Sequence, residues 1–226
     1  MTMCGVGSAA LLGSRSREPG NAGMTMCRMT SPNTFAPGGT SAGGAPLIRA
    51  YRDEDDASLL DCIAELQDAE RAIDARLRRG RAIAPDYLVA MLEECRQWAG
   101  QIFLLEVDGA VAGFTTVYTR VPFERLDEPP GDYAIVAELL VRREYRRRGY
   151  ARALLAHGER YAAAEGAAEL RIGVLSDNTA ARALYLDYGF RPYIETLSKP
   201  LEMFHSQPRL VASGDVGAEE RSGASE

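Results

Sequence analysis

The sequence has few of the residues that usually carry metal or nucleophilic chemistry, with two histidines and four cysteines among 226 residues. Cys4, Cys27, Cys62 and Cys95 form no CxxC pair and no cysteine–histidine cluster of the kind that zinc needs. Neither histidine belongs to a Ser–His–Asp arrangement. We therefore expect free thiols in a reducing cytoplasm and no metal site.

Long apolar stretches are also absent, because no run approaches the roughly 20 residues of a membrane-spanning helix. No basic region precedes the short apolar stretch near the N-terminus, so a secretory signal is not expected. The net charge of -6 argues against a chain that coats nucleic acid and favours cationic partners. We expect a cytoplasmic monomer or homodimer with no membrane or nucleic-acid partner.

Composition divides the chain into three parts. Residues 1–45 are dominated by small residues, proline and methionine without any period, so we expect a disordered N-terminal extension. Residues 207–226 are small, acidic and aperiodic and predict a disordered C-terminal tail. Residues 46–206 are expected to form one folded domain. The tetrapeptide MTMC occurs twice before residue 28, which leaves the translation start open.

Within that domain the hydrophobic period alternates between that of strands and that of helices. The dipeptide Asp108-Gly109 joins two β-branched runs and predicts a tight hairpin. We expect an α/β fold whose sheet is antiparallel at its start and parallel between the strands at 133–141 and 169–175. The remaining expected elements are a strand at 47–51, helices at 53–72, 85–100, 150–166 and 178–189, hairpin strands within 101–121, and a final strand or bent pair of strands at 190–201.

The stretch VRREYRRRGYARALL, residues 141–155, joins the apolar strand at 133–141 to the following helix. A helix N-terminus presents unpaired N–H groups and the positive end of the dipole, which together bind phosphate. Gly149 lets the backbone approach a ligand, and arginines supply bidentate donors. The arginines are consistent with a phosphate site, with a solvated surface, or with a patch for nucleic acid.

Two motifs distinguish these alternatives. The first is the pattern (Arg/Gln)-x-x-Gly-x-(Gly/Ala), which Arg146, Gly149 and Ala151 match. The second is the stretch NTAARALYLDYGF at residues 178–190. Through these two motifs the chain resembles the GNAT superfamily of N-acyltransferases, and the resemblance extends over most of residues 47–203. The resemblance implies a GNAT-like mixed central sheet flanked by helices on both faces. It also implies direct acetyl transfer from acetyl-CoA to a primary amine of a small molecule or peptide in a ternary complex.

The resemblance also assigns a binding site for CoA. It implies that the backbone of 139–141 pairs with the pantetheine arm, with an oxyanion donor near Leu139 or Leu140, and that the turn before the helix holds the pyrophosphate. The CoA-binding residues that it implies are Leu139, Leu140, Val141, Arg146, Arg147, Arg148, Gly149, Tyr150, Ala151, Arg152 and Asn178.

Two residues are candidates for catalysis. Glu138 interrupts an apolar strand, where burial would raise the pKa of a carboxyl toward that of a useful general base. It could equally be an edge glutamate that faces solvent or pairs with an arginine, and a bulge would change its facing. The resemblance makes Tyr185 the donor of a proton to the leaving thiolate; otherwise it is a core tyrosine. We expect His157 to be a packing or surface residue.

A noncatalytic CoA-sensing module with the same fold is the alternative function, and an arginine-rich nucleic-acid binder is a third. For the acceptor, the loop at 122–132 carries Glu124, Asp127, Glu128 and Asp132, and the first helix begins with further acids. Carboxylates at the edge of a cleft attract cations, so we expect a polyamine, an aminoglycoside-like amine or a basic peptide. Acidic loops are also often only solvated.

Overall fold

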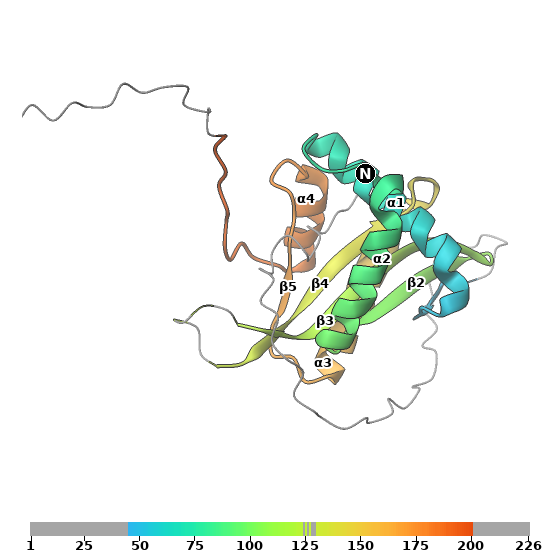
Figure 1. The fold of residues 1–226 in the computed structure, drawn as a ribbon. Helices are drawn as coiled ribbons and strands as arrows, with labels where there is room; N and C mark the ends of the chain where they lie inside the picture. Colours follow the sequence, from blue (N-terminus) through green and yellow to red (C-terminus); the bar gives the residue numbers. More distant parts are fainter. Residues whose placement is uncertain (1–44, 124, 126, 128–129, 201–226) are drawn as a thin grey trace, which may run out of the picture. The chain divides into compact units, whose positions relative to one another are not determined.

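A mixed sheet forms the centre of the fold, and its five strands follow one another in sequence order. The structure is a computed structural model that describes residues 45–123, 125, 127 and 130–200 (Figure 1). The chain divides after Arg191 into two units, and the sheet lies in the first. The strands are β1 (Leu47–Ala50), β2 (Gln101–Val107), β3 (Ala110–Pro122), β4 (Asp132–Val141) and β5 (Leu170–Ile172).

The hairpin of β2 and β3 forms at the predicted dipeptide. Asp108 and Gly109 have φ angles of 52° and 77°, the positive values that a tight hairpin turn between twisted strands requires. Val107 pairs with Ala110 directly beside this turn, and the pairs β1–β2, β2–β3 and β3–β4 are antiparallel. The predicted hairpin and the antiparallel start of the sheet are confirmed.

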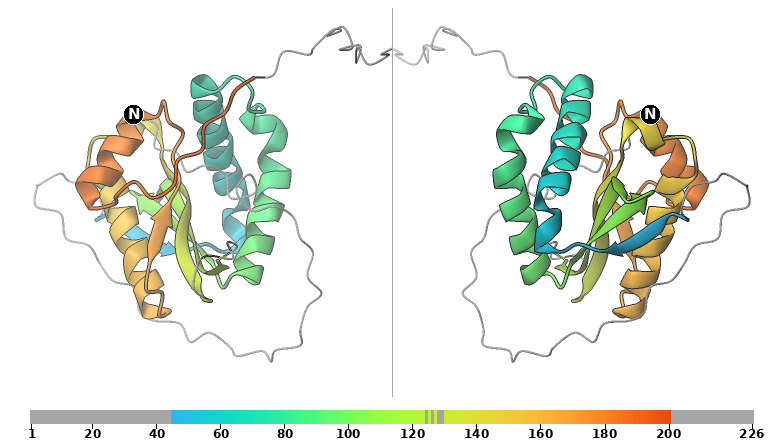
Figure 2. Two further views of the ribbon diagram at one scale, coloured as in Figure 1. Left: turned by 90° about the vertical axis from the view of Figure 1, so that its left-hand side faces the viewer. Right: turned by 90° about the vertical axis from the view of Figure 1, so that its right-hand side faces the viewer.

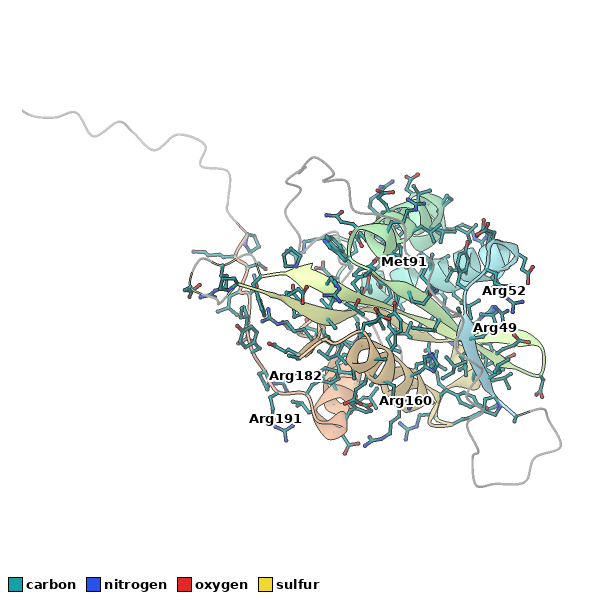
Figure 3. All side chains as sticks on the ribbon, turned by 90° about the horizontal axis from the view of Figure 1, so that it is seen from below. Arg49, Arg52, Met91, Arg160, Arg182 and Arg191 are labelled. Atoms are coloured by element: carbon teal, nitrogen blue, oxygen red, sulfur yellow. The ribbon has the colours of Figure 1, made fainter. Side chains whose placement is uncertain are left out.

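Helices cover both faces of the sheet, as predicted (Figure 2). On one face lie α1 (Asp56–Ile73), which follows a 3-10 turn at Asp53–Asp55, and α2 (Gly80–Gln97). On the other lie α3 (Tyr150–Ala164) and α4 (Thr179–Tyr188). Figure 3 shows Met91 of α2 and Arg160 of α3 on opposite sides of the sheet. Among the described residues, no helix has both the length and the apolar character to cross a membrane.

The second helix begins earlier than the sequence indicates. We predicted a start at Pro85, yet α2 begins at Gly80, whose N–H donates to Asp68 Oδ1 of α1 over 2.7 Å. A Cβ on Gly80 would lie 2.1 Å from the carbonyl oxygen of Ala64, so only glycine allows the two helices to approach this closely. Proline usually lies in the first turn of a helix, but here the hydrogen bond to Asp68, twelve residues before Gly80, sets the start of α2.

The βαβ unit of β4, α3 and β5 gives the parallel pair that the sequence predicts. Residues Ala134–Val136 pair with Leu170–Ile172, and α3 packs its Leu154 and Leu155 into a core that includes Val136. The second strand is shorter than the predicted 169–175, because its pairing with β4 ends at Ile172.

The predicted final strand is wrong over the described residues 190–200, which form neither helix nor strand. Residues 191–200 are exposed throughout, so no side of the segment is buried as one face of a strand would be. Pro192 and Pro200 also lack the N–H group that a strand ladder uses. The disorder expected for 1–45 and 207–226 falls, apart from Ala45, outside the described residues.

Candidate functional site

The pairing of β4 with β5 ends partway along β4, and we call the uncovered stretch beyond it the opening beside β4. Pairing stops at Val136, and the described residues 173–178 that follow β5 form no strand. Residues 137–141 of β4 therefore have an edge that no described strand covers. An extended ligand that carries amide groups can pair with such an edge as an added strand would.

The predicted residues Leu139, Leu140 and Val141 lie on this edge with their side chains buried. Leu139 and Val141 pack on the side of α3, whereas Leu140 packs on the side of α1 and α2. The uncovered edge of β4 therefore presents the backbone groups of these residues. This arrangement fits the predicted pairing with a pantetheine arm.

The arginine-rich turn between β4 and α3 has the backbone geometry of an anion site. A 3-10 turn at Arg143–Tyr145 leads into Arg147 and Gly149, which both have positive φ angles, 66° and 82°. Gly149 precedes the first residue of α3, and a Cβ added to it would meet nothing within 4 Å. The glycine thus leaves open space in front of the N–H groups that begin the helix, where an anion binds well.

Arg146 is turned inward rather than toward that open space. Its side chain is 9% exposed; Nε donates to the Val141 carbonyl over 2.8 Å and a terminal nitrogen donates to Glu65 Oε1 over 3.0 Å. Burial lowers the pKa of Arg146, and the charge of Glu65 partly offsets that effect. The predicted signature arginine therefore ties the turn to β4 and α1 in this structure.

Glu65 is a residue that the sequence reasoning missed. Besides Arg146, it accepts the N–H of Arg143 over 2.9 Å and lies 3.6 Å from Nε of Arg142. One carboxylate of α1 thus contacts three residues of a turn that follows it by about 80 positions. No local signal in the sequence could reveal these contacts, because Glu65 reads as an ordinary polar position of an amphipathic helix.

A concavity of about 520 Å³ lies between α1 and the same turn. Both walls are charged, with carboxylates on α1 and guanidinium groups on the turn and on the start of α2. Its lining residues are Asp61, Ala64, Glu65, Asp68, Ala69, Ala72, Arg81, Arg142, Arg143 and Arg146.

The other predicted residues of the turn divide into exposed cations and buried packing groups. Arg147 and Arg148 are exposed, and Arg148 lies over the Tyr145 ring at 5.9 Å. Arg152 donates to Asp187 of α4 over 2.7 Å, so it links the two helices. By contrast, Ala151 is buried in the core on the α3 side of the sheet, and Tyr150 packs against that core. These two residues therefore offer a ligand their backbone N–H groups.

Asn178 begins α4 and is 4% exposed. Its Oδ1 accepts the N–H of Ala181 over 3.2 Å, which caps the helix. Its Nδ2 is buried without a hydrogen-bond partner among the described residues. A buried donor without an acceptor costs free energy, and a ligand with a carbonyl oxygen at this position would accept its hydrogen bond. This orphan donor fits the predicted place of Asn178 at the CoA site.

Tyr185 shares the buried face of α4, at 3% exposed. Its ring meets Phe190 edge-on, with centroids 6.1 Å apart, and it belongs to the core cluster that includes Leu139 and Ala151. Asn178 and Tyr185 are seven positions apart, and both are buried. The proton-donor role of Tyr185 stays a prediction.

A bulge in β4 decides which way Glu138 faces. Thr116 and Val117 of β3 pair with Glu138 and Val136, so Ala137 is an extra residue. Val136 packs on the side of α3, whereas Glu138 faces α2. Glu138 is 1% exposed, which rules out the edge glutamate that faces solvent.

Tyr87 of α2 holds this carboxylate. Its hydroxyl donates to Glu138 Oε1 over 2.5 Å, and the backbone carbonyl of Glu138 accepts Thr115 Oγ1 over 2.8 Å. Burial raises the pKa of Tyr87, as do the nearby charge of Glu138 and their hydrogen bond. The sequence analysis gave Tyr87 no role, because nothing near it in the chain indicates this contact.

The remaining chemical groups have structural surroundings. His157 of α3 packs against Phe103 with ring centroids 4.4 Å apart, and burial lowers its pKa. Cys62 and Cys95 are free, and burial raises the pKa of each thiol to about 12. The described residues contain no group of three side chains that could hold a metal ion. His205, Cys4 and Cys27 lie outside them.

Solved structures with the same fold include several acetyltransferases. The aminoglycoside N-acetyltransferase AAC(6')-Iy, bound to the bisubstrate analogue CoA-S-monomethyl-acetylneamine, is 16% identical with a TM-score of 0.55 and covers 70% of this chain and 99% of its own. A mutant protein from Bacillus halodurans is 16% identical with a TM-score of 0.60, covering 69% and 99%. A GCN5-related N-acetyltransferase from Ralstonia eutropha JMP134 is 20% identical with a TM-score of 0.53, covering 70% and 99%. At these identities the likeness shows the fold.

Sequence comparison identifies the family. No curated protein sequence matches the chain significantly. The profile of the acetyltransferase (GNAT) family, however, matches residues 65–190, which is more than half of the chain and runs from the middle of α1 to just past α4. The matched region contains the opening beside β4, the arginine-rich turn, Glu138 and Asn178. This chain belongs to the acetyltransferase (GNAT) family.

Proposed function

We propose that this protein transfers an acetyl group from acetyl-CoA to a primary amine, directly and within a ternary complex. The observation that carries the proposal is the edge of β4 at residues 137–141, which no described strand covers and which joins the buried Glu138 to the arginine-rich turn. An extended thioester ligand that pairs with residues 139–141 would run past that carboxylate. The fold thus supports one site for a phosphate group, an amide chain and a proton acceptor.

The CoA-binding part of the proposal assigns a role to each group that the turn presents. The pyrophosphate would lie at the start of α3, where Gly149 leaves space and the N–H groups of Tyr150, Ala151 and Arg152 begin the helix. Arg147 and Arg148 are exposed beside it and would add charge-assisted hydrogen bonds. Asn178 Nδ2 would donate to a carbonyl of the pantetheine arm. Arg146 would act indirectly, by holding the turn to β4.

The chemistry needs three groups. The amine nitrogen forms a bond to the thioester carbonyl carbon while Glu138 takes the proton that the nitrogen loses. Backbone N–H groups near Leu139 stabilise the charge on the carbonyl oxygen. The carbon–sulfur bond then breaks and Tyr185 gives a proton to the departing thiolate, so that the products are an acetamide and CoA with a free thiol. No acyl-enzyme is needed.

The acceptor that we propose is a cationic amine, small molecule or peptide. The acidic loop supports this less than its sequence indicates, because Asp127 pairs with Arg125 and Asp132 lies 3.6 Å from Arg120. The buried carboxylates Glu70 and Glu138, on α1 and β4, give further support. If ionised, these two carboxylates would make the region around α2 negative, which favours a positively charged substrate.

Release of CoA thiol from acetyl-CoA, measured with a panel of amines that includes neamine, spermidine and a lysine-containing peptide, tests the proposed function. We expect turnover with at least one amine and loss of most turnover in Glu138→Gln, together with an acetylated amine by mass spectrometry. Binding of CoA without turnover of any amine would support a noncatalytic module instead. Binding of nucleic acid that falls steeply with salt, without any effect of CoA, would support the third alternative.

A further inference from the structure

Tyr87 and Glu138 form a buried polar pair that joins α2 to the centre of β4. The two residues are 51 positions apart in the chain, and their oxygens are 2.5 Å apart. An ionised carboxylate only accepts hydrogen bonds, whereas a phenol has one proton to donate. The contact therefore stabilises the ionised form of Glu138, and it restrains the orientation of the carboxylate through Oε1.

Burial alone would act in the opposite direction. A carboxylate that is 1% exposed has lost nearly all of its water, and desolvation favours the neutral acid. Neutral glutamic acid cannot take a proton from an amine. The phenol of Tyr87 replaces part of the lost hydration with one directed hydrogen bond, and the backbone of Glu138 is held independently by Thr115.

Among the described residues, the ionisable groups that act on Tyr87 include Glu70 and Tyr118 besides Glu138. Glu70 of α1 lies close enough to Tyr87 to raise its pKa, and Tyr118 of β3 is close enough to Glu138 for its own pKa to be raised by that charge. Tyr118 in turn donates to Glu94 of α2 over 2.8 Å, beside the thiol of Cys95. Ionised carboxylates among these neighbours would disfavour a further negative charge on Glu138, and the hydrogen bond from the Tyr87 hydroxyl acts against that repulsion.

We propose that Tyr87 is a positioning residue for acetyl transfer, which orients the Glu138 carboxylate and keeps it ionised at neutral pH although it is buried. The inference rests on the proposed function, in which Glu138 accepts the proton of the amine. Tyr87 itself touches no reacting atom in this scheme. Its effect should therefore show in the pH dependence of turnover and in the titration of Glu138.

The test compares Tyr87→Phe with the wild type and with Tyr118→Phe. Both variants remove one hydroxyl from a ring that stays in place, but Tyr118 donates to Glu94 rather than to Glu138. Turnover of acetyl-CoA with neamine or spermidine is measured against pH. The Glu138 carboxyl is titrated separately by infrared difference spectroscopy, in which its band is assigned by its loss in Glu138→Gln. This second measurement needs no acceptor.

In Tyr87→Phe we expect the acidic limb of kcat/KM and the carboxyl titration to move together to higher pH. A hydrogen bond to a charged group corresponds to a shift of about one to two pH units. Tyr118→Phe should leave both near the wild-type position. An unmoved carboxyl titration in Tyr87→Phe would overturn the positioning role, whatever the activity. A carboxyl titration that moves while the turnover profile does not would instead overturn the role of Glu138 in the proposed function, and the inference with it.

Discussion

Replacement of Glu65 tests how the cofactor turn is held. Glu65 is 27% exposed and contacts the backbone of Arg143 and the guanidinium groups of Arg142 and Arg146. Because Arg146 is 9% exposed, Glu65→Ala would leave a largely buried cation without this carboxylate. Breaking a fully buried pair costs about 3 to 5 kcal/mol. Water can replace part of the loss at the exposed side of Glu65, so we expect the free energy of unfolding to fall by about 2 to 3 kcal/mol.

The same change should weaken CoA binding without touching the ligand. The ordered form of the turn loses one charge-assisted hydrogen bond of about 1.5 kcal/mol. The fraction of molecules whose turn is ordered for CoA binding therefore falls by as much as tenfold. The apparent Kd for CoA then rises by up to about tenfold. Glu65→Gln keeps an oxygen that can accept from Arg143 and should lie between wild type and Glu65→Ala on both measures.

Denaturant unfolding and calorimetric titration of CoA measure the two effects. Glu54→Gln is a matched control, because Glu54 also pairs with an arginine but its side chain is 71% exposed. Exposed pairs contribute at most about 1 kcal/mol, so this variant should behave as wild type. If Glu65→Ala left both the unfolding free energy and the CoA affinity at wild-type values, the anchoring role of Glu65 would be refuted.

Three further predictions follow from individual contacts. Tyr185→Phe should lower turnover severalfold or more with little change in CoA affinity, as steady-state kinetics and calorimetry can show; equal turnover would remove Tyr185 from the chemistry. Burial lowers the pKa of His157, so its stabilising effect is complete above the unfolded pKa of about 6.5 and is lost as pH falls through the folded value. His157→Phe should therefore flatten the loss of stability between about pH 7 and 5, measured by denaturant midpoints, and an unchanged slope would contradict this. Gly113→Ala should destabilise the fold by about 1 to 3 kcal/mol in urea, because its Cβ would lie 2.3 Å from the Leu140 carbonyl oxygen; wild-type stability would show that the strands adapt.

Local chemistry made much of the fold predictable from the sequence. The Asp108-Gly109 turn needs positive φ angles that these two residues supply, so the hairpin followed from two positions alone. The apolar strand at 133–141 and the motif of Arg146, Gly149 and Ala151 located the start of α3 in the same way. Each of these signals lies within a few consecutive residues, and tertiary contacts did not override them.

Contacts between distant elements were not predictable. The start of α2 depends on a cap from Asp68, and the facing of Glu138 depends on a bulge at Ala137 that the pairing with β3 reveals. Glu65 and Tyr87 reach the site across about 80 and 51 positions. Their residue types are ordinary for helices, so the sequence carries no local mark of their roles.

The final strand failed for a related reason. The run at 190–201 has the composition of a strand, yet a strand also needs a neighbour and a buried face. Residues 191–200 are exposed on all sides, and two prolines interrupt their N–H groups. Strand propensity was present there without the tertiary contacts that stabilise a strand.

Calorimetric titration of acetyl-CoA into the wild type and into Gly149→Glu tests the central claim most directly. Gly149 adopts a positive φ of 82° in open space before α3, so glutamate there would put bulk and negative charge where the phosphates are proposed to bind. We predict a saturable heat of binding for the wild type and none for Gly149→Glu, with far-UV circular dichroism unchanged. Equal acetyl-CoA affinity in the two proteins would contradict the assignment of this turn as the cofactor site.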